Sequence, residues 1–434
     1  MKEISDTTFC VIDRATFFPV AKRLARDAKK VYYHRPDGDA FRVFAKGILG
    51  DGHGDVTYLN DFWKIKDQID CWVFPDCMDA GLQLELESQG KPVWGSKDAE
   101  DLEQMRGRWL DKARELGMPM PKTHKILGLT NLRLFFSKHQ GQTFFVKIST
   151  WRGDMETWRA WEPHQIRNKC DLLAMKFGPF QEGITFYVQE KIDTKIESGA
   201  DTYFNNGQFP SKVILGYEKK GASYFATWKE RSEMPPVVWG VMDQIAPTLE
   251  KLRYCNMISS EVRIKDGKSY WLDPCFRFPS PAGEEELELY ENFSETVWHG
   301  ANGEFVEPKM SAKFCGEAVI QYTGDKEGWK SVVIPEEVEA FVKLYACGYD
   351  DGAYHFPPHQ DCEAIGCAIA LGDTPKEVLD GLKEIKEALG DAPVDLAIEP
   401  LADLFAQIDL AESKGIPFSE QELPEPAEVI SNGD

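Results

Sequence analysis

The chain has 434 residues, of which 42% are hydrophobic, and its formal net charge is −22. This length exceeds that of one ordinary domain and predicts about three. The acidity argues against nucleic acid as the main partner, because a phosphate backbone is bound by clustered Lys and Arg. No apolar run reaches the ~18 residues that span a bilayer, and the first residues lack the apolar core of a signal peptide, so we expect a soluble, cytoplasmic protein without a membrane partner.

The ten cysteines stand singly, without a C-x-x-C pair. Several, such as Cys10, Cys71 and Cys367, lie in apolar runs, which favours reduced core thiols over disulfides or a zinc cluster. The acidic residues gather near 283–295, including three consecutive glutamates from Glu284, and at the C-terminal end. We interpret these acidic runs as solvated charge that keeps the protein soluble.

Strands and helices alternate along residues 1–100, and this rhythm predicts a doubly wound α/β domain. No G-x-G-x-x-G follows the first strand, so a dinucleotide cofactor is not supported. The expected elements are strands at 9–12, 31–33, 71–74 and 92–95 and a helix at 16–28.

Beyond residue 100 the pattern predicts a mixed α+β region at 101–308 and a C-terminal α+β domain at 309–415, followed by an acidic, disordered tail at 416–434. The expected helices are at 99–117, 171–177, 238–252, 375–389 and 400–412, and the expected strands include 144–148, 185–190 and 365–370.

A hairpin pattern carries two acidic residues twelve positions apart, Glu261 and Asp273, on either side of Asp266-Gly267. An odd-numbered loop centred on Gly267 would make the two carboxylates direct cross-strand partners, and a divalent cation between them would offset their repulsion. A two-residue turn would instead place them on opposite faces. An acidic, solvated hairpin is the alternative interpretation.

Motifs in a fixed order accompany this hairpin, at 102–106, 117–121 (Gly-Met-Pro-Met-Pro), 145–149, 189–192 and 273–277. Their order resembles the ATP-grasp superfamily, and within it the phosphoribosylamine-glycine ligase branch, over most of residues 1–395. The resemblance implies an ATP-grasp fold of α/β and α+β domains. These are a doubly wound pre-ATP-grasp domain, a two-lobed ATP-grasp domain with a hinge near 189–193 and a small C-terminal α+β domain.

The resemblance also implies residues that bind the phosphates of ATP. Arg106 takes the place of the first phosphate-binding lysine, with Arg108 as the competing choice and a solvated helix cation as the alternative. Lys147 matches the second nucleotide lysine, and so apolar a strand makes an unpaired lysine costly to bury. Arg152 and Gly153 correspond to the mobile loop that closes over the triphosphate, although an ordinary surface turn is also compatible with them.

By the same resemblance, backbone groups near Glu190 and Ile192 hydrogen-bond the adenine edge at the hinge. Glu197, seven residues past Glu190, then holds the ribose hydroxyls. An exposed acidic turn is the competing interpretation for Glu197.

The hairpin corresponds to the metal site of the superfamily, so Glu261 and Asp273 become ligands of Mg²⁺. The following text, Asp273-Pro-Cys275-Phe-Arg277, departs from the pattern E-x-N-x-R at two positions. Cys275 replaces an oxygen ligand by a thiol, which is a poor partner for Mg²⁺. Arg277 is a candidate to stabilise the transferring phosphoryl group, and Arg263 shares a face with Glu261 and is a second catalytic candidate.

Two further groups of residues could bind a substrate or a metal. Four lysines between hinge and hairpin lie where a substrate carboxylate or phosphate would be received, without individual roles; they are Lys212, Lys219, Lys220 and Lys229. His355 and His359 suggest a metal site, but the prolines between them exclude a helix that would align the two rings.

The resemblance implies an ATP-dependent carboxylate-amine ligase that uses ATP and Mg²⁺ and acts on small-molecule carboxylate and amine substrates. The γ-phosphoryl passes to a carboxylate, an amine attacks the acyl phosphate, and an amide forms. Glycine and phosphoribosylamine are what the nearest branch would imply. A kinase of the same fold, or an ATP-binding sensor or scaffold disabled by Cys275, are the rival functions, and the oligomeric state is open.

Overall fold

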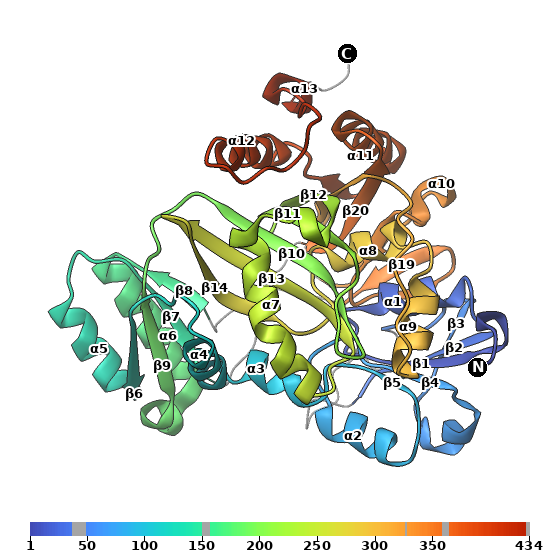
Figure 1. The fold of residues 1–434 in the computed structure, drawn as a ribbon, viewed down its shortest axis with the longest axis horizontal. Coiled ribbons are helices and arrows are strands. Elements are labelled where there is room, and N and C mark those ends of the chain that lie inside the picture. The colour runs from blue at the N-terminus through green and yellow to red at the C-terminus, as the bar shows by residue number, and fades with distance from the viewer. Residues whose placement is uncertain (37–48, 150–156, 326–327, 358–363, 431–434) are drawn as a thin grey trace. The chain divides into compact units, whose positions relative to one another are not determined.

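The computed structural model describes residues 1–36, 49–149, 157–325, 328–357 and 364–430. The chain forms two compact units (Figure 1). Unit 1 comprises Met1–Ala99, Ser198–Ser260 and Cys275–Asp434, and unit 2 comprises Glu100–Glu197 and Glu261–Pro274. Among the described residues, no helix is both long and apolar enough to cross a membrane. The expected domain boundaries stay a prediction.

The N-terminal part of unit 1 is a five-stranded parallel sheet in the order β3-β2-β1-β4-β5. Phe9 and Val11 of β1 enter one hydrophobic cluster with α1, whereas Cys10 and Ile12 enter a second cluster on the other face. Because both faces are covered, the doubly wound architecture is confirmed. The elements are β1 (Thr8–Ile12), α1 (Phe18–Ala25), β2 (Lys30–His34), β3 (Val56–Tyr58), β4 (Cys71–Val73), α2 (Ala80–Ser88) and β5 (Val93–Trp94).

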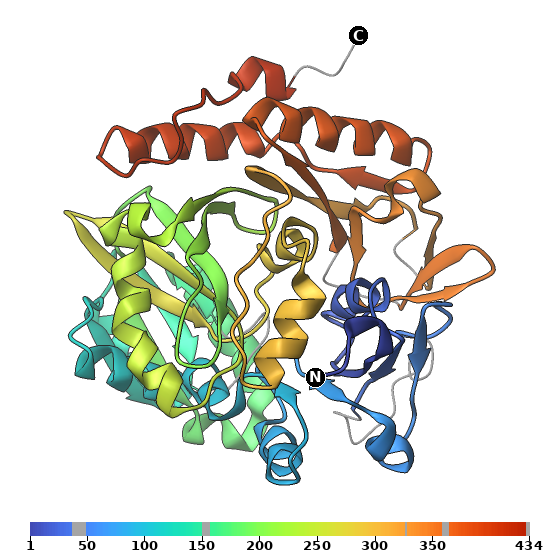
Figure 2. The same ribbon diagram turned by 45° about the vertical axis from the view of Figure 1, so that its right-hand side comes forward.

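The rest of unit 1 is built on antiparallel strands in the order β13-β10-β11-β12-β15-β20-β17, with β21 paired to β15. Gly316 of β15 lies against α11, since a Cβ there would meet the Val378 side chain at 2.6 Å. The neighbouring Cys315 faces Glu285 of α8, so the two helices cover opposite faces. Figure 2 shows α11 and α12 lying along the sheet. The strands are β10 (Glu197–Phe204), β11 (Lys212–Lys219), β12 (Ser223–Glu230), β13 (Asn256–Lys265), β15 (Phe314–Tyr322), β17 (Val342–Leu344), β20 (Ala364–Gly372) and β21 (Val394–Leu396).

A small three-stranded sheet, β16-β19-β18, completes unit 1. Its strands are β16 (Lys330–Val332), β18 (Gly348–Asp350) and β19 (Ala353–Phe356). The remaining helices of this unit are α7 (Pro236–Lys251), α8 (Gly283–Leu289), α9 (Phe293–Ala301), α10 (Glu336–Glu339), α11 (Pro375–Leu389), α12 (Leu401–Glu412) and α13 (Pro426–Ile430).

The glutamates at 284–286 are buried, so their interpretation as solvated charge is wrong. They lie on α8, and each is at most 1% exposed. Burial raises the pKa of Glu285 and of Glu286 well above its ordinary value, with nearby Asp201 as a further cause. Burial thus favours the neutral form of the Glu285 and Glu286 carboxyls, because a charge is costly to bury.

The disorder expected for 416–434 is wrong for residues 416–430. Ile416, Phe418 and Val429 are at most 4% exposed. The Phe418 ring lies 5.7 Å from the ring of Tyr217 and 5.8 Å from that of Phe225. The Phe418 ring thus attaches an otherwise acidic segment to the sheet, and Ile416 and Val429 are buried as well. Residues 431–434 lie outside the described range.

Unit 2 contains a four-stranded sheet in the order β6-β9-β7-β8. Phe144, Val146 and Ile148 of β7 pack with α5 and α6 in one hydrophobic cluster. The opposite face of β7 carries Lys147. The elements are α3 (Glu100–Gln104), α4 (Arg106–Glu115), β6 (Thr123–Leu127), α5 (Leu129–Lys138), β7 (Phe144–Ile148), β8 (Thr157–Ala160), α6 (Pro163–Phe177) and β9 (Thr185–Glu190), together with the hairpin of β13 from Glu261 and β14 (Lys268–Cys275).

Helix α11 begins with a capping box that should stabilise it measurably. The Thr374 hydroxyl accepts a hydrogen bond from the Glu377 amide at 3.2 Å, and the Glu377 carboxylate accepts one from the Thr374 amide at 3.2 Å. We expect Thr374→Ala to lower the free energy of unfolding by about 1 kcal/mol. The conservative Thr374→Ser should retain most of this stability in urea unfolding. Equal midpoints for the alanine variant and the wild type would contradict the contribution of the cap.

Candidate nucleotide and acceptor sites

Lys147 is a buried lysine on an inner strand of unit 2. It pairs with Tyr187 of β9 on one side and Thr157 of β8 on the other. Its side chain is 3% exposed, and its ammonium donates to both carboxylate oxygens of Asp273, at 2.8 and 2.7 Å. A third bond reaches the Leu272 carbonyl at 3.2 Å. Asp273 is therefore a counterion for the Lys147 ammonium, which would be costly to bury unpaired in so apolar a strand.

Arg106 reaches the same carboxylate from the first turn of α4. The helix expected at 99–117 is interrupted at Met105, and this break lets the Arg106 amide donate to the Ser149 carbonyl at 3.1 Å. The Arg106 guanidinium forms an ion pair with Asp273, and its side chain is 10% exposed. Arg108 instead pairs with Asp101 and is 60% exposed. Of the two competing arginines, Arg106 is the buried one.

Two tryptophans fix α4 against the hairpin. The Trp109 ring meets the Trp271 ring edge to face with centroids 4.8 Å apart, and its Nε1 donates to the Trp271 carbonyl at 3.3 Å. Trp109 lies three residues after Arg106 on α4, and Trp271 lies two residues before Asp273 on β14, so each tryptophan shares a face with its charged residue. The packing of the indoles thus positions the ion pair.

The hairpin turn has two residues, Asp266 and Gly267, and both have positive φ, as in a type I′ turn. Continued without interruption, the ladder from this turn places Glu261 opposite Leu272. The observed turn is therefore the two-residue alternative, and not the odd-numbered loop that would have made Glu261 and Asp273 direct cross-strand partners. Their role as Mg²⁺ ligands stays a prediction.

The residues expected around adenine and ribose lie at the end of β9 and the start of β10. Glu197 is 19% exposed in its side chain and forms an ion pair with Arg263. Glu190 forms a partly exposed pair with Lys122 at 3.0 Å, and its amide donates to the Lys122 carbonyl at 3.0 Å. Arg263 thus has a carboxylate partner, and Glu197 is not a freely solvated acid.

Several residues that the sequence suggested for binding are not placed at these sites by the structure. Arg152, Gly153 and His359 lie outside the described residues. His355 bonds to Ser331 Oγ through Nδ1 at 2.8 Å and to the Asp350 carbonyl through Nε2 at 3.2 Å. Of the lysines between hinge and hairpin, Lys219 pairs with Asp403 at 2.7 Å, and Lys212 lies 5.0 Å from the Trp228 ring centre. These contacts leave the individual roles of the lysines unassigned.

A second polar cluster lies in unit 1, at the carboxyl ends of the parallel strands β1 and β4. These neighbours pair at Val11 and Val73, and the strand order reverses between them. Asp13 follows β1 and is 1% exposed, and Asp76 follows β4 and is 7% exposed. Ligands of doubly wound sheets bind at such a switch point, outside the carboxyl ends of the strands.

Arg277 belongs to this second cluster. Its Nε lies 3.7 Å from Asp76 Oδ1, its guanidinium lies 5.6 Å from the Phe17 ring centre, and its Nη1 donates to the Phe278 carbonyl at 2.8 Å. Within unit 1 the side chain is therefore oriented by a carboxylate and an aromatic ring. Cys275 Sγ contacts the Arg277 carbonyl at 3.7 Å.

The Asp13 carboxyl combines a satisfied and an unsatisfied oxygen. Its Oδ2 accepts from the Phe17 amide at 2.8 Å and from the Tyr33 hydroxyl at 2.9 Å. Its Oδ1 is buried and has no hydrogen-bond partner within the described part of the chain. Burial, followed by the charge of Asp76, raises the pKa of Asp13 from 3.8 to about 6. The cluster can therefore accept a hydrogen bond from a ligand at Oδ1.

Sequence reasoning did not single out Asp13 and Asp76. The available signal was an aspartate one or two residues after each of two apolar runs, at 9–12 and 71–74. That signal becomes specific only when the strand order is known, because the order makes β1 and β4 neighbours.

The raised pKa of Asp13 should make folding stability depend on pH. Between pH 3.8 and about 6 the folded state holds a proton that the unfolded state releases, so stability should fall as pH rises through this window. Relative to Asp13→Asn, the wild type should lose on the order of 2 to 3 kcal/mol between pH 4 and pH 7. Urea unfolding of both proteins across this range measures the difference, and parallel pH profiles would contradict the assignment.

Comparison with solved structures shows enzymes of the same fold. The phosphoribosylamine-glycine ligase of Thermotoga maritima has a TM-score of 0.65 and 14% identity, covering 90% of this chain and 97% of that one. The L-amino acid ligase of Bacillus licheniformis has a TM-score of 0.58 and 13% identity, covering 91% and 99%. The biotin carboxylase domain of the 2-oxoglutarate carboxylase from Hydrogenobacter thermophilus, solved with MgADP and bicarbonate, has a TM-score of 0.64 and 11% identity, covering 100% of both chains.

No protein-family model matches the sequence, and no curated protein matches it either. At identities of 11 to 14% the structural similarity concerns the fold alone. The fold expected from the order of motifs is confirmed: the chain has the ATP-grasp fold.

Proposed function

We propose that the protein is an ATP-dependent ligase that joins a small-molecule carboxylate to an amine through an acyl phosphate. One observation carries the proposal: Arg106 and Lys147, from a helix and an inner strand, converge on the carboxylate of Asp273. Two buried cations thus meet at one carboxylate. Such a group fits a polyphosphate that carries a divalent metal.

Arg106 and Lys147 bind the phosphates in this proposal. Both side chains are at most 10% exposed, so their charges are little screened by water. Asp273 balances the two cations when no nucleotide is present. When the triphosphate binds, the cations gain phosphate oxygens and the Asp273 carboxylate is released toward the metal.

Asp273 is the proposed carboxylate ligand of Mg²⁺ beside Arg106 and Lys147. Glu261 is the proposed second ligand, which requires an irregularity in the ladder between turn and site, because an uninterrupted ladder turns the two carboxylates to opposite faces. Among the residues outside the gaps, no group of three or more His, Cys, Asp or Glu side chains could hold a metal. Magnesium often takes only one or two carboxylates together with phosphate oxygens and water, so a small donor set fits it. The ion would neutralise charge on the phosphates during transfer.

Glu197 is proposed to hold the ribose hydroxyls and the backbone near Glu190 and Ile192 to bind the adenine edge. Arg263 orients the Glu197 carboxylate through their ion pair. The Glu190 amide already donates to the Lys122 carbonyl, and the Ile192 carbonyl accepts from the Thr194 amide at 3.1 Å, so the Ile192 amide is the proposed donor to the base.

The cluster in unit 1 is the proposed acceptor site. Asp13 Oδ1 and Asp76 would accept hydrogen bonds from an amine, and Arg277 would bind the carboxylate and then the charge of its acyl phosphate. Glycine and phosphoribosylamine have the required groups. The protein forms no covalent bond to the substrates, and its contribution is orientation and charge neutralisation.

Asp273→Asn should strongly reduce turnover and Mg²⁺-dependent binding of ATP, and because it also removes the counterion of Lys147 it should lower the free energy of unfolding, so activity is compared at a temperature where the variant is folded. The substitution removes the charge that holds the metal, and we expect a loss on the order of 10² to 10³-fold in kcat/KM. Asp273→Glu keeps the charge and should retain much more activity. ADP release, with circular dichroism as the folding control, gives the comparison, and unchanged ATP turnover in Asp273→Asn would defeat the assignment.

Glu261→Gln tests the second metal ligand separately. We expect a higher Mg²⁺ concentration for half-maximal turnover, because one anionic oxygen is lost. An unchanged Mg²⁺ dependence would remove Glu261 from the metal site and leave Asp273 as its carboxylate.

Asp76→Asn should raise the KM for the amine about tenfold or more while the KM for ATP stays within twofold. Asp70 is the matched control, since it precedes the same strand at its amino end and pairs with Lys2 at 2.7 Å. Asp70→Asn should change neither constant. Steady-state kinetics with each substrate varied in turn decides, and a changed KM for ATP alone would contradict the acceptor role.

A further inference from the structure

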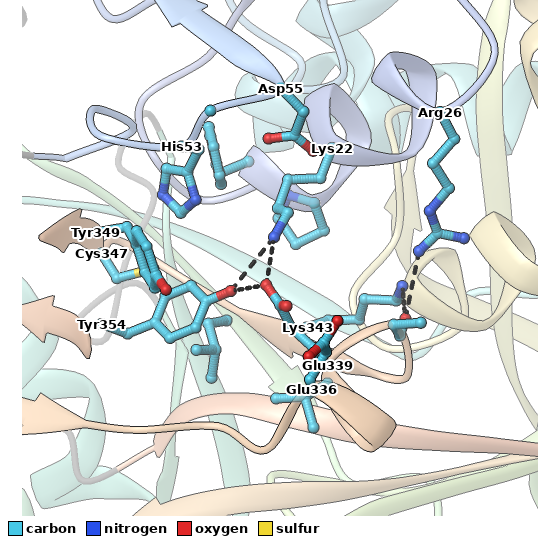
Figure 3. Close-up of a pocket in the computed structure, with 16 residues that line it drawn as sticks. Lys22, Arg26, His53, Asp55, Glu336, Glu339, Lys343, Cys347, Tyr349 and Tyr354 are labelled. Atoms are coloured by element: carbon cyan, nitrogen blue, oxygen red, sulfur yellow. Dashed lines mark hydrogen bonds and ion pairs between the residues drawn. The ribbon is translucent and has the colours of Figure 1, made fainter. Parts of the chain in front are cut away.

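A cavity of about 480 Å³ lies within unit 1, between α1, the loop before β3 and residues 336–354 (Figure 3). This volume falls in the range of about 300 to 1,000 Å³ that is usual for small-molecule sites. Its wall contains none of the residues assigned above to the nucleotide, the metal or the acceptor. The cavity is therefore a separate candidate site.

One end of the cavity is aromatic. The His53 ring lies 4.3 Å from the Phe18 ring and 5.8 Å from each of the Tyr349 and Tyr354 rings. The two tyrosines meet edge to face at 5.0 Å. Figure 3 shows the three rings gathered on one side of the cavity. Such a wall is suited to a planar ring, because aromatic pairs gain about 0.5 to 1.5 kcal/mol beyond their buried area.

His53 also supplies an unused polar atom. The residue is 5% exposed, and its Nε2 is buried without a hydrogen-bond partner in the described ranges of the chain. Burial, followed by the charge of Lys22, lowers the pKa of His53 to about 3, so the imidazole is neutral. An unpaired buried nitrogen costs about 1 to 3 kcal/mol. A ligand with a complementary ring edge would recover part of this cost.

The other end of the cavity is cationic. Arg26 and Lys343 share a single carboxylate, Glu288, at 2.7 and 2.6 Å. Between the two ends, Lys22 pairs with Glu339 at 2.9 Å and donates to the Tyr354 hydroxyl at 3.3 Å. The Arg26 and Lys343 end thus holds two cations against one ion-paired carboxylate.

Two more carboxylates line the cavity, Asp55 and Glu336, but both are exposed, where solvent screens their charge. Lys343 is 5% exposed in its side chain and is screened far less. The Arg26 side chain is 39% exposed and is screened as these two carboxylates are, so a ligand's anionic group is favoured mainly by Lys343, with Arg26 beside it.

We propose that this cavity binds an effector in which a heteroaromatic ring is joined to an anionic group, as in a nucleoside monophosphate. The ring lies among His53, Tyr349 and Tyr354, and the anion is bound by Arg26 and Lys343. The cavity volume, the unpaired nitrogen and the shared carboxylate each support this class of ligand independently.

Helix α1 connects this cavity to the acceptor cluster, and this step rests on the proposed function. Phe18 lines the cavity, and the adjacent Phe17 donates its amide to Asp13 and lies under Arg277. A ligand that moves the start of α1 therefore changes the groups that hold the acceptor. By linkage, the effector and the amine then alter each other's affinity by the same factor.

The test is calorimetric titration of the full chain with AMP, adenosine and ribose 5-phosphate. AMP should bind at least about tenfold more tightly than either half, because only AMP occupies both ends of the cavity. Saturable binding of AMP that exceeds both halves supports the proposal. No saturable binding of AMP, or equal binding of AMP and one of its halves, overturns it.

Two variants place the ligand. His53→Phe keeps an aromatic ring but removes Nε2, and Arg26→Gln removes one cation. Each substitution should weaken AMP binding about tenfold. Lys29→Gln makes the same change of charge on an exposed residue just after α1 and should alter binding less than twofold. Unchanged affinity in both His53→Phe and Arg26→Gln overturns the assignment.

Lys147→Met separates this site from the nucleotide site. AMP should bind to that variant as it binds to the wild type. If AMP binding were lost in Lys147→Met and kept in His53→Phe, AMP would bind at Arg106 and Lys147, and the effector site would be overturned. Binding of AMP that depends on His53, in a protein that turns over no ATP, would support the effector site and contradict the proposed function.

Discussion

The charge of Lys147 is the constraint on which unit 2 depends. An ammonium that is 3% exposed on an inner strand needs an anion within reach, because an uncompensated buried charge is severely destabilising. Asp273 supplies it, and the edge-to-face packing of Trp109 against Trp271 holds the helix and strand that bring Arg106 and Asp273 to the same point. The Asp273 carboxylate thus holds Arg106 and Lys147 in place for a phosphate group.

In unit 1, two carboxylates and a guanidinium lie where we propose that a polar substrate binds. The reversal of strand order between β1 and β4 opens the place where Asp13 and Asp76 stand, and Phe17 and Asp76 orient Arg277. The same α1 helix that starts beside Asp13 forms a wall of the His53 cavity. Substrate recognition and the proposed effector site are therefore joined by one short helix.

Local patterns predicted much of this fold, because alternation and helical spacing are properties of neighbouring residues. They predicted β1, β7, β9 and α11 closely, and a lysine in an apolar strand pointed to Lys147. Tertiary contacts decided the rest. The glutamates at 284–286 are buried on α8 by packing that no local pattern encodes, and Phe418 attaches a segment whose acidity suggested disorder. Asp13 and Asp76 come together only through the strand order. The two-residue turn at Asp266-Gly267 sets which face of the hairpin Glu261 occupies, and the sequence left the length of this turn open.

The most direct test of the proposed ligase is the fate of a carboxylate oxygen. The protein would be incubated with Mg²⁺-ATP, an array of amines and carboxylates labelled with ¹⁸O, and the phosphate and organic products analysed by mass spectrometry. An acyl-phosphate route transfers one labelled oxygen to inorganic phosphate and yields an amide, and both should disappear in Asp273→Asn. A stable phosphorylated product with no amide, or ATP binding without any turnover across the array, would contradict the ligase and favour a kinase or a sensor, respectively.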